Sequence, residues 1–409
     1  MNSVSRSSCV YLLPIAIALA LGACATRGSH DAVALADTVE QGASGATLEE
    51  GQRIFRYDTF GDETQWTDKL QLHKVVNDKM QPVEALALGL KVDMDKLDMS
   101  KFITHNPLAA GGTRELLRQD AVVGLKATFD AQGNIATLGV TCALCHSTVD
   151  NAMLPGIGHR LDGWPNRDLD PGAIIAMSPT LTAEQKAVYK SWGKGMYDPR
   201  YNQDKKNGPV VIPPAFGLKG VHPIIFTGDG QEISYWNRYV AVTQMGGHGT
   251  FKDPRIGTTG VDVTNGTDDL VSSKLPALQA YQISLPAPPP PKGSFNAAAA
   301  ERGEQLFRGS AGCASCHSGP LFTDAGTRLH DPSEVVSEPE AAGVPSYASR
   351  SATKKYRTTP LRGVWQHAPY FHNGSAKTLV DVVSTYNERK SLNLSKSQVD
   401  DVAEYLKSL

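Results

Sequence analysis

The sequence predicts a mainly α-helical protein of two related domains with long loops, the first of which carries a large insertion. Three observations lead to this expectation. A glycine followed four residues later by phenylalanine occurs in two similar segments, residues 50–56 and 301–308. A proline-rich stretch, residues 286–291, separates the two copies. Alternation of apolar and polar residues, the pattern of strands, is confined to short stretches such as residues 121–129.

The composition is that of a soluble globular protein. The 409 residues exceed what one compact core usually holds, because domains commonly contain about 100 to 200 residues. The 40 basic residues nearly balance the 42 acidic ones, so nothing indicates capture of nucleic acid by charge, and we expect none to bind. With 41% hydrophobic and 20% charged residues, the chain resembles neither a disordered nor a multi-span membrane protein.

The first residues are typical of an export signal. An apolar run begins at Val10 and is too short for a bilayer core, which takes ~20 helical residues, so we assign residues 1–23 to a signal peptide. Residues 21–24 resemble a bacterial lipoprotein processing box, in which Cys24 is lipidated. Ala25, directly after this cysteine, resembles the pattern of lipoproteins that are sorted to the outer membrane. We therefore expect a periplasmic protein whose lipid anchor is its one membrane attachment. The alternative is ordinary cleavage before Cys24.

The four cysteines that remain lie in two CxxCH patterns, Cys142–His146 and Cys313–His317. CxxCH is the attachment signal of c-type haem, in which two thiols bond the porphyrin and the histidine reaches the iron. A disulfide framework would leave the histidines unexplained, and a zinc site would need further ligands. We expect two covalently bound haem c groups, held by Cys142, Cys145, Cys313 and Cys316, with His146 and His317 as proximal iron ligands.

The repeated segment indicates where each haem domain begins. In small cytochromes c, a helix that ends in such a glycine and aromatic pair packs on the haem. The alanine run after Asn296, a good N-cap, fits such a helix. Five residues separate Phe307 from Cys313, whereas eighty-six separate Phe55 from Cys142. The N-terminal domain therefore contains the insertion.

The chain is thus expected to hold two cytochrome c-like haem domains. Their limits are a linker at 24–45, an N-terminal domain at 46–285, a stiff polyproline spacer at 286–293 and a C-terminal domain at 294–409. The last domain should close with an amphipathic helix, because Ser395 and Gln398 can form a capping box. The apolar face of this helix carries Val399, Val402 and Leu406.

The C-terminal domain contains two further motifs, TPLRG at 359–363 and APYFHNGS at 368–375. With two CxxCH motifs in this order, the chain resembles the bacterial di-haem cytochrome c peroxidase and MauG superfamily, whose C-terminal domain carries a TPxLR and PYFH-D/N-G signature. The resemblance is clear over 296–409 and fair over 140–165 and around 224–247. It is absent from much of the remaining N-terminal domain.

The resemblance implies a distal ligand for the C-terminal haem. In the family this ligand falls fourteen residues after the signature histidine, as Met in the peroxidases and Tyr in MauG, and the matching residue here is Tyr386. It would lie on the inward face of a helix that Thr378 can cap. A phenolate ligand stabilises ferric and higher iron. The alternative is a core tyrosine whose hydroxyl group is hydrogen-bonded elsewhere.

The resemblance also implies a gate at the N-terminal haem. Residues 154–159 resemble the segment that bears the distal histidine of the peroxidases, so His159 is expected as a sixth ligand or beside the open iron face. The alternative is a surface loop residue. The family further implies an interdomain calcium, for which the matching ligands are the side chain of Asn166 and the carbonyls of His367 and Pro369.

Two departures weaken a simple peroxidase interpretation. The family has a tryptophan between the haems, but the matching segment here, 226–230, contains none. The family also has a catalytic glutamate, and the matching residue here is Gln244. Cleavage of peroxide needs a group that moves a proton between the two oxygens, which Gln244 cannot do. His159, His248 or an acid from the insertion would have to replace it. Trp192 or Trp236 would replace the tryptophan between the haems, unless each is an ordinary aromatic residue of the core.

The leading functional hypothesis is a di-haem oxidoreductase of the peroxidase and MauG type. Its N-terminal haem would meet peroxide or dioxygen, and its C-terminal haem would pass electrons from a donor protein such as a small cytochrome or cupredoxin. A non-enzymatic periplasmic electron carrier is the second hypothesis, favoured by the missing glutamate. The third is an oxygenase like the rubber oxygenases, which resemble this superfamily and lack the same glutamate.

Overall fold

The structure is a computed structural model that describes residues 45–78, 80–100, 111–338 and 342–409. The predicted signal peptide and the lipid site at Cys24 lie outside these residues. The described residues belong to one compact unit of the chain. No helix in this described part is both long and apolar enough to cross a membrane.

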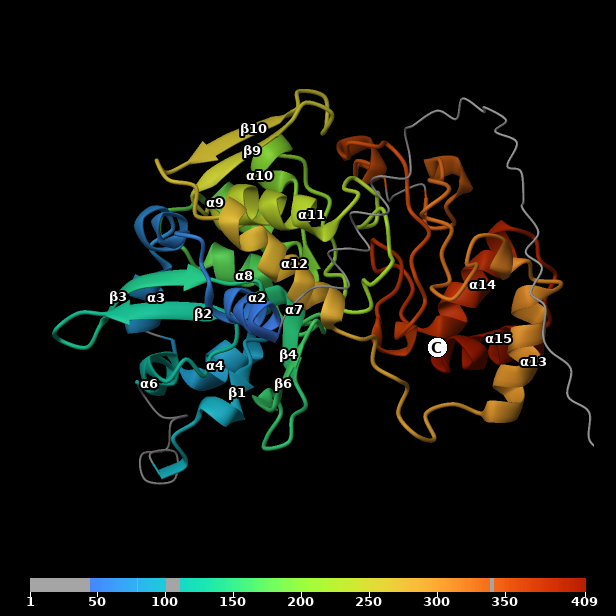
Figure 1. The fold of residues 1–409 in the computed structure, drawn as a ribbon, viewed down its shortest axis with the longest axis horizontal. Helices are drawn as coiled ribbons and strands as arrows, with labels where there is room; N and C mark the ends of the chain where they lie inside the picture. Colours follow the sequence, from blue (N-terminus) through green and yellow to red (C-terminus); the bar gives the residue numbers. More distant parts are fainter. Residues whose placement is uncertain (1–44, 79, 101–110, 339–341) are drawn as a thin grey trace, which may run out of the picture. The chain divides into compact units, whose positions relative to one another are not determined.

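Helices and short helical turns are distributed along residues 45–285 (Figure 1). In chain order they are α2 (Gly45–Tyr57), η1 (Thr64–Lys69), α3 (Leu72–Asp78), α4 (Pro82–Ala87), η2 (Met94–Lys96), α6 (Gly112–Arg118), α7 (Ala143–His146), α8 (Pro171–Ala176), α9 (Ala183–Lys190), α10 (Tyr201–Asp204), α11 (Ile233–Tyr239), η3 (Val240–Met245), η4 (Ser272–Lys274) and α12 (Leu275–Ser284). The rest of the chain contains α13 (Ala297–Arg308), η5 (Cys313–Ser315), η6 (Pro332–Glu334), η7 (Ala348–Arg350), η8 (Val364–Gln366), α14 (Leu379–Arg389) and α15 (Lys396–Lys407).

The expectation of a mainly α fold needs correction, because the N-terminal half also contains small sheets. All sheets among the described residues are two-stranded. Antiparallel pairs join β2 (Leu125–Phe129) to β3 (Ile135–Val140), β4 (Ser147–Val149) to β6 (Arg160–Asp162), β7 (Met196–Tyr197) to β8 (Val210–Val211) and β9 (Gly249–Asp253) to β10 (Val261–Asn265), while β1 (Val92–Asp93) runs parallel to β5 (Ile157–Gly158). The fold is therefore mixed, with 40% of the described residues helical.

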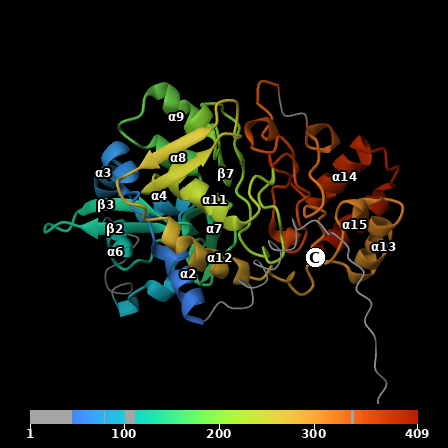
Figure 2. The ribbon, with the colours of Figure 1, turned by 45° about the horizontal axis from the view of Figure 1, so that its top comes forward.

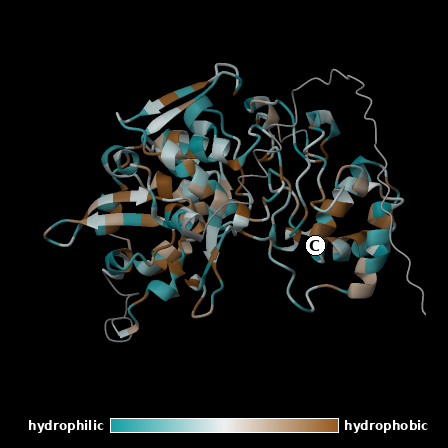
Figure 3. Cartoon of the chain, in the orientation of Figure 1, coloured by the Kyte–Doolittle hydropathy of each residue, from teal (hydrophilic) through white to brown (hydrophobic). Residues whose placement is uncertain are grey.

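The β2–β3 hairpin shows how the insertion forms strands. In β2, apolar residues alternate with Lys126 and Thr128, and the hairpin shows mixed hydropathy in Figure 3. The Gly133 N–H closes its turn by donating to the carbonyl of Asp130 at 3.0 Å. Of the apolar residues in β3, Ile135, Leu138 and Val140 are buried. Such hairpins depend on local alternation and turn residues, so they add strands without requiring a large sheet.

The repeated segments form the same helix packing in both halves. Gly51 of α2 lies so close to α12 that a Cβ would stand 2.0 Å from the carbonyl oxygen of Ala277, and Gly303 of α13 lies equally close to the carbonyl of Asp401 in α15. Figures 1 and 2 show both pairs side by side. The phenylalanine that follows each glycine packs on a tyrosine of the partner helix, with ring centroids 5.7 Å apart for Phe55 and Tyr281 and 5.2 Å for Phe307 and Tyr405.

The C-terminal helices begin where the sequence predicts. Ser395 caps α15 by accepting a hydrogen bond from the Gln398 N–H, and Val399, Val402 and Leu406 are buried. Asn296 caps α13 through the N–H of Ala299 at 3.0 Å. These caps use side chains three residues away, so the local sequence is enough to specify them.

Two main hydrophobic cores lie on either side of the proline run. One contains buried residues from Ile54 to Tyr281, and the other contains buried residues from Phe307 to Leu406. Residues 286–291 belong to no helix or strand. The division into two haem domains stays a prediction, although each core surrounds one CxxCH segment.

A buried arginine ties the second half to the first. Arg350 is 2% exposed, and its guanidinium group contacts Asp198 at 2.8 Å and Asp204 at 2.7 Å. It also donates to the carbonyl oxygens of Lys206 and Gly208. A buried charge with this many acceptors is well compensated, and removing either side would leave the other unpaired.

Candidate haem sites

The first CxxCH segment presents a neutral imidazole. Cys142 is the N-cap of α7, and the His146 N–H donates to its carbonyl at 3.2 Å. Nδ1 of His146 lies 3.1 Å from the carbonyl oxygen of Pro213, which can only accept, so the ring hydrogen sits on Nδ1 and Nε2 keeps its lone pair. Burial lowers the pKa of His146 to about 4. This is the tautomer and charge state that binds iron.

The second CxxCH segment repeats this arrangement. The His317 N–H donates to the Cys313 carbonyl at 3.0 Å, and Nδ1 of His317 lies 3.1 Å from the Phe322 carbonyl oxygen. Burial lowers the pKa of His317. The ring of Phe307, from the repeated segment, lies 6.3 Å from the imidazole.

The thiols and cavities also fit haem. Burial raises the pKa of Cys142 and Cys145 to about 12, and the described cysteines form no disulfide. Cys142, Cys145 and His146 line one cavity of about 240 Å³, and Cys313, Cys316 and His317 line another of about 590 Å³. Each site thus offers two free thiols and one neutral histidine around one hollow, as covalent haem attachment requires.

The N-terminal cavity is largely apolar. Helices and strands of the insertion supply much of its wall, including Trp66, Leu72, Val75, Val76, Met80, Leu117 and Leu138. Helix α8, which follows the CxxCH segment, adds Ile174 and Ile175. Among the described residues, no aspartate or glutamate lines this cavity, and His146 is its one histidine. The wall therefore offers no carboxylate and no second histidine for proton transfer, although Tyr197 and Tyr347 line it.

Gln244 lies in this wall, on η3, and is 5% exposed. Its Oε1 accepts hydrogen bonds from the Tyr197 hydroxyl at 3.1 Å and from Asn202 Nδ2 at 3.3 Å. Its Nε2 donates to Thr243 Oγ1 at 2.9 Å. The amide is thus fixed at the cavity that contains His146, where the sequence comparison placed it.

The structure does not bring His159 to the cavity. Its side chain is 52% exposed, and Nδ1 lies 2.8 Å from a carboxylate oxygen of Asp95. The His159 N–H donates to Asp150. His248, the other histidine considered for proton transfer, does not line the cavity either. This placement favours the alternative interpretation of His159 as a surface residue.

Tyr386 shares the C-terminal cavity with His317. It projects from α14, and its ring centroid lies 6.2 Å from that of Phe371. Burial raises the pKa of Tyr386 to about 12, so its hydroxyl group is protonated at neutral pH unless a metal ion stabilises the phenolate. No hydrogen-bond partner of the hydroxyl occurs among the described residues. Its role as the distal ligand stays a prediction.

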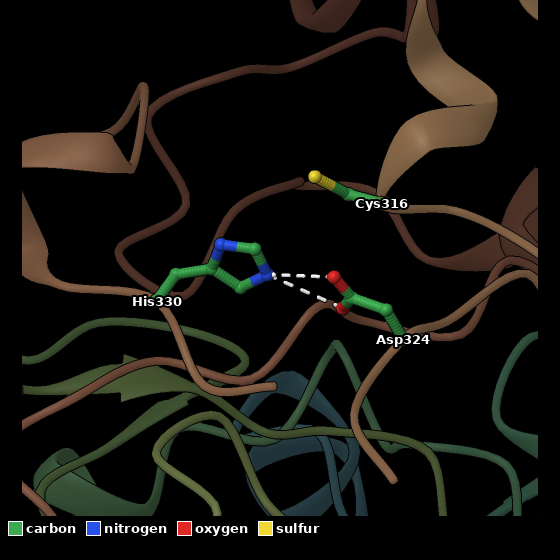
Figure 4. A group of neighbouring side chains, drawn as sticks. All are labelled: Cys316, Asp324 and His330. Carbon is green, nitrogen blue, oxygen red and sulfur yellow. Dashed lines mark hydrogen bonds and ion pairs between the residues drawn. The ribbon is translucent and has the colours of Figure 1, made fainter. Parts of the chain in front are cut away.

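Near the second haem site, Cys316, Asp324 and His330 form a tight group (Figure 4). Their ligand atoms all lie within 4.8 Å of one another. His330 Nε2 lies 3.1 Å from the Asp324 carboxylate and 3.0 Å from Thr358 Oγ1. A metal ion would need the free thiol of Cys316, which haem attachment consumes. We therefore interpret the buried histidine and the partly buried aspartate as a pair beside the haem site.

The predicted calcium ligands fit a metal ion poorly. Asn166 Oδ1 is buried and receives no hydrogen bond among the described residues, which would suit a ligand. However, Arg167 Nη2 donates to the His367 carbonyl at 3.0 Å, so a guanidinium group holds the second expected ligand. A nearby divalent cation would be repelled by this buried charge. We derive no step from calcium.

A thin wall separates the two cavities. The residues that line both are Val211, Pro213, Pro214, Leu218, Phe226 and Arg357. Of the two tryptophans considered as bridges, Trp236 lines the N-terminal cavity alone. Trp192 lines neither and packs on Tyr189 and Tyr197. Phe226 is the aromatic residue that both cavities share, and it opens the segment that matches the family's tryptophan motif.

Comparisons with known proteins match parts of the chain. A family profile described as RoxA-like, cytochrome c-like, matches residues 355–392. Cytochrome c551 peroxidase of Pseudomonas aeruginosa is 32% identical over 149 residues, which cover 32% of this chain and 42% of that protein. Hydrazine synthase subunit gamma of Kuenenia stuttgartiensis is 31% identical over 147 residues, covering 27% of this chain and 41% of that protein.

Methylamine utilization protein MauG of Methylorubrum extorquens is 31% identical over 124 residues, which cover 27% of this chain and 34% of that protein. The chain thus matches less than half the length of each of these relatives.

Proposed function

Because this chain is related to the bacterial di-haem cytochrome c peroxidase and MauG superfamily, we propose that it is a di-haem c-type oxidoreductase. We propose further that its N-terminal cavity oxidises an apolar organic substrate with dioxygen. The observation that carries this proposal is the wall of that cavity, which is apolar and offers no carboxylate among its described residues.

The wall suits an apolar substrate for a physical reason. Apolar surface is transferred from water into such a cavity at a gain of about 25 cal/mol per Å². The one charged side chain in its described wall is Arg357, which lies where the two cavities share residues. A c-type haem held by His146 would supply an iron able to bind dioxygen or peroxide. The insertion contributes α3 and α6 to the wall, which is how it would shape a substrate site.

Gln244 would bind an uncharged oxygen ligand. Of its two amide N–H groups, one donates to Thr243, and the other has no partner among the described residues. The Tyr197 hydroxyl fixes the amide orientation by donating to Oε1. Such an amide can donate a hydrogen bond but cannot release and recapture a proton. This favours binding of dioxygen over cleavage of peroxide.

The C-terminal site would handle electrons. Tyr386 as a phenolate ligand would favour oxidised iron, and Phe226 would fill the wall between the two sites. We propose a small cytochrome or cupredoxin as the redox partner. We also propose that the protein acts in the periplasm, anchored by lipid at Cys24 to the outer membrane.

Peroxidase activity is the second candidate function, and its support is that related proteins are cytochrome c peroxidases. The structural argument against it is the neutral Gln244 at the position of the family's glutamate. Electron transfer without catalysis is the third candidate, and it requires that neither iron has an open face.

EPR of the ferric holoprotein, combined with oxygen uptake, tests the proposal. One high-spin haem, together with oxygen consumption and oxygenated products from emulsified squalene, an isoprenoid alkene, is the expected result. Fast dye oxidation by peroxide without oxygen uptake would assign a peroxidase instead. Two low-spin haems with no turnover of either kind would assign an electron carrier.

A further inference from the structure

Buried arginines in this protein are generally paired with carboxylates. Arg200 is 1% exposed and pairs with Asp229. Arg160, with a 2% exposed side chain, lies 3.0 Å from Asp93. Arg350 contacts two aspartates, as described above. The pairing follows from the high cost of burying an uncompensated charge.

Two arginines depart from this rule, Arg167 and Arg357. Neither forms an ion pair with any described aspartate or glutamate. Arg167 Nε and Nη1 are buried without a hydrogen-bond partner, and its Nη2 donates to a backbone carbonyl. Arg357 Nε is likewise buried without a partner, while its Nη1 donates to the Pro223 carbonyl at 3.2 Å. Burial lowers the pKa of both to about 10, so both stay charged at neutral pH.

Both side chains face the haem cavities. Arg167 lines the C-terminal cavity, and Arg357 lines both cavities. A third buried group without a partner, Nε2 of His367, lines the C-terminal cavity as well. The cavities therefore present several buried nitrogen atoms without partners. The one carboxylate that lines either cavity among the described residues, Glu334, is paired with Arg328.

A c-type haem carries two anionic propionate groups besides its covalent and iron bonds. Guanidinium groups match carboxylates in charge and in geometry, because two parallel N–H groups can donate to two oxygens. We propose that Arg167 binds a propionate of the C-terminal haem and that Arg357, in the wall between the cavities, binds propionate groups of both haems. The inference rests on the binding of two haems and holds whichever substrate the protein oxidises.

Arg357 would then set the reduction potentials of both haems. A buried positive charge favours the reduced state of a nearby haem, because reduction removes one positive charge from the iron site. Its loss would lower both potentials and leave propionates unpaired. Loss of Arg167 would lower one potential alone. A purely structural role of either arginine would not produce this pattern.

Redox titration of the holoprotein, followed by optical and EPR signals, tests the assignment. Arg357→Gln should lower both midpoint potentials, each by at least the equivalent of a tenfold change in the redox equilibrium, 59 mV for one electron. Arg167→Gln should lower one of them to the same degree. Arg308→Gln is the matched control, because Arg308 is 60% exposed and paired with Glu304, so its charge is screened.

Unchanged potentials in Arg357→Gln with both haems retained would overturn the proposal. So would equal shifts of both potentials in the two variants. If a glutamine variant does not fold, the lysine variant at the same position is used, because it keeps the positive charge without the two parallel N–H groups of a guanidinium. It should retain both haems and shift the midpoint potential by less than the glutamine variant is expected to. A lysine variant identical to the wild type in potentials and haem content would also contradict the bidentate assignment. Oxygen uptake is measured separately, so its absence would reject the proposed function and leave this inference standing.

Discussion

Replacing Gln244 by glutamate should create peroxidase activity in the N-terminal cavity. Thr243 Oγ1 already donates to the Tyr239 carbonyl at 2.6 Å, so it can only accept from the residue at 244. A glutamate there must keep a proton on the oxygen that replaces Nε2, while its other oxygen accepts from Tyr197 and Asn202. The new carboxyl group would therefore have a raised pKa and could donate a proton and take it back.

The expected increase in peroxidase activity follows from the usual contribution of general acid–base catalysis. Such a group accelerates proton transfer by about 10² to 10⁴-fold, which corresponds to about 3 to 5 kcal/mol of activation free energy. The assay is steady-state oxidation of a dye by hydrogen peroxide, with kcat/KM compared between Gln244→Glu and the wild type. Haem content and optical spectra should match, so that the change concerns the wall and not the cofactor.

Gln282→Glu is the matched control for this substitution. Gln282 is also a buried amide that lines the same cavity, from α12, and its Oε1 accepts from Asn237 Nδ2 at 2.7 Å. An acid at 282 should have a much smaller effect. The reasoning would be refuted if kcat/KM with peroxide did not increase in Gln244→Glu, or if it increased equally in both variants. Either result would show that residue 244 does not determine whether peroxide is cleaved.

Further predictions concern the C-terminal site, the metal and the helix packing. Tyr386→Phe should change the EPR signal of one haem and raise its potential if the phenolate binds iron, whereas unchanged spectra would make Tyr386 a core residue. Removing calcium with EGTA should leave the thermal midpoint and haem spectra unaltered, because Arg167 already holds the His367 carbonyl; a midpoint lowered by several degrees would contradict this. Gly303→Ala should destabilise the protein by about 1 to 3 kcal/mol, measured by denaturant unfolding, because its Cβ would meet the Asp401 carbonyl. An unchanged unfolding free energy would show that α13 and α15 can separate without loss.

Features that the sequence predicted correctly depend on residues close together in the chain. Ser395 and Gln398 are three residues apart, so their cap could be read directly. The glycine and phenylalanine of each repeat predicted a helix that packs on the haem; the structure has the helix in both halves, and the close contact of its glycine with a second helix is an addition. Gln244 was matched to the family's glutamate through a local motif; it lines the cavity that contains His146, and its role there stays a prediction.

Features that were missed depend on contacts between distant residues. The carbonyl that orients His146 belongs to Pro213, sixty-seven residues away, and a backbone carbonyl has no sequence signal. Arg357 lies in no motif, and only its place between two cavities reveals it. His159 ends a segment that resembles a ligand loop, and its side chain pairs with Asp95 at the surface, as the alternative interpretation has it; its role at the haem stays a prediction. The short strands were underestimated because each pairs over only a few residues.

The contacts of Arg350 limit how far this protein can be divided. A fragment starting after the proline run would expose a guanidinium group that has lost both of its aspartates, and the complementary fragment would retain two carboxylates without a cation. Each fragment would then be less stable for two reasons: its part of the ion cluster has lost its partners, and apolar surface becomes exposed. The duplicated helix pairs therefore do not make interchangeable modules, and attempts to graft one half onto another cytochrome should carry Asp198, Asp204 and Arg350 together.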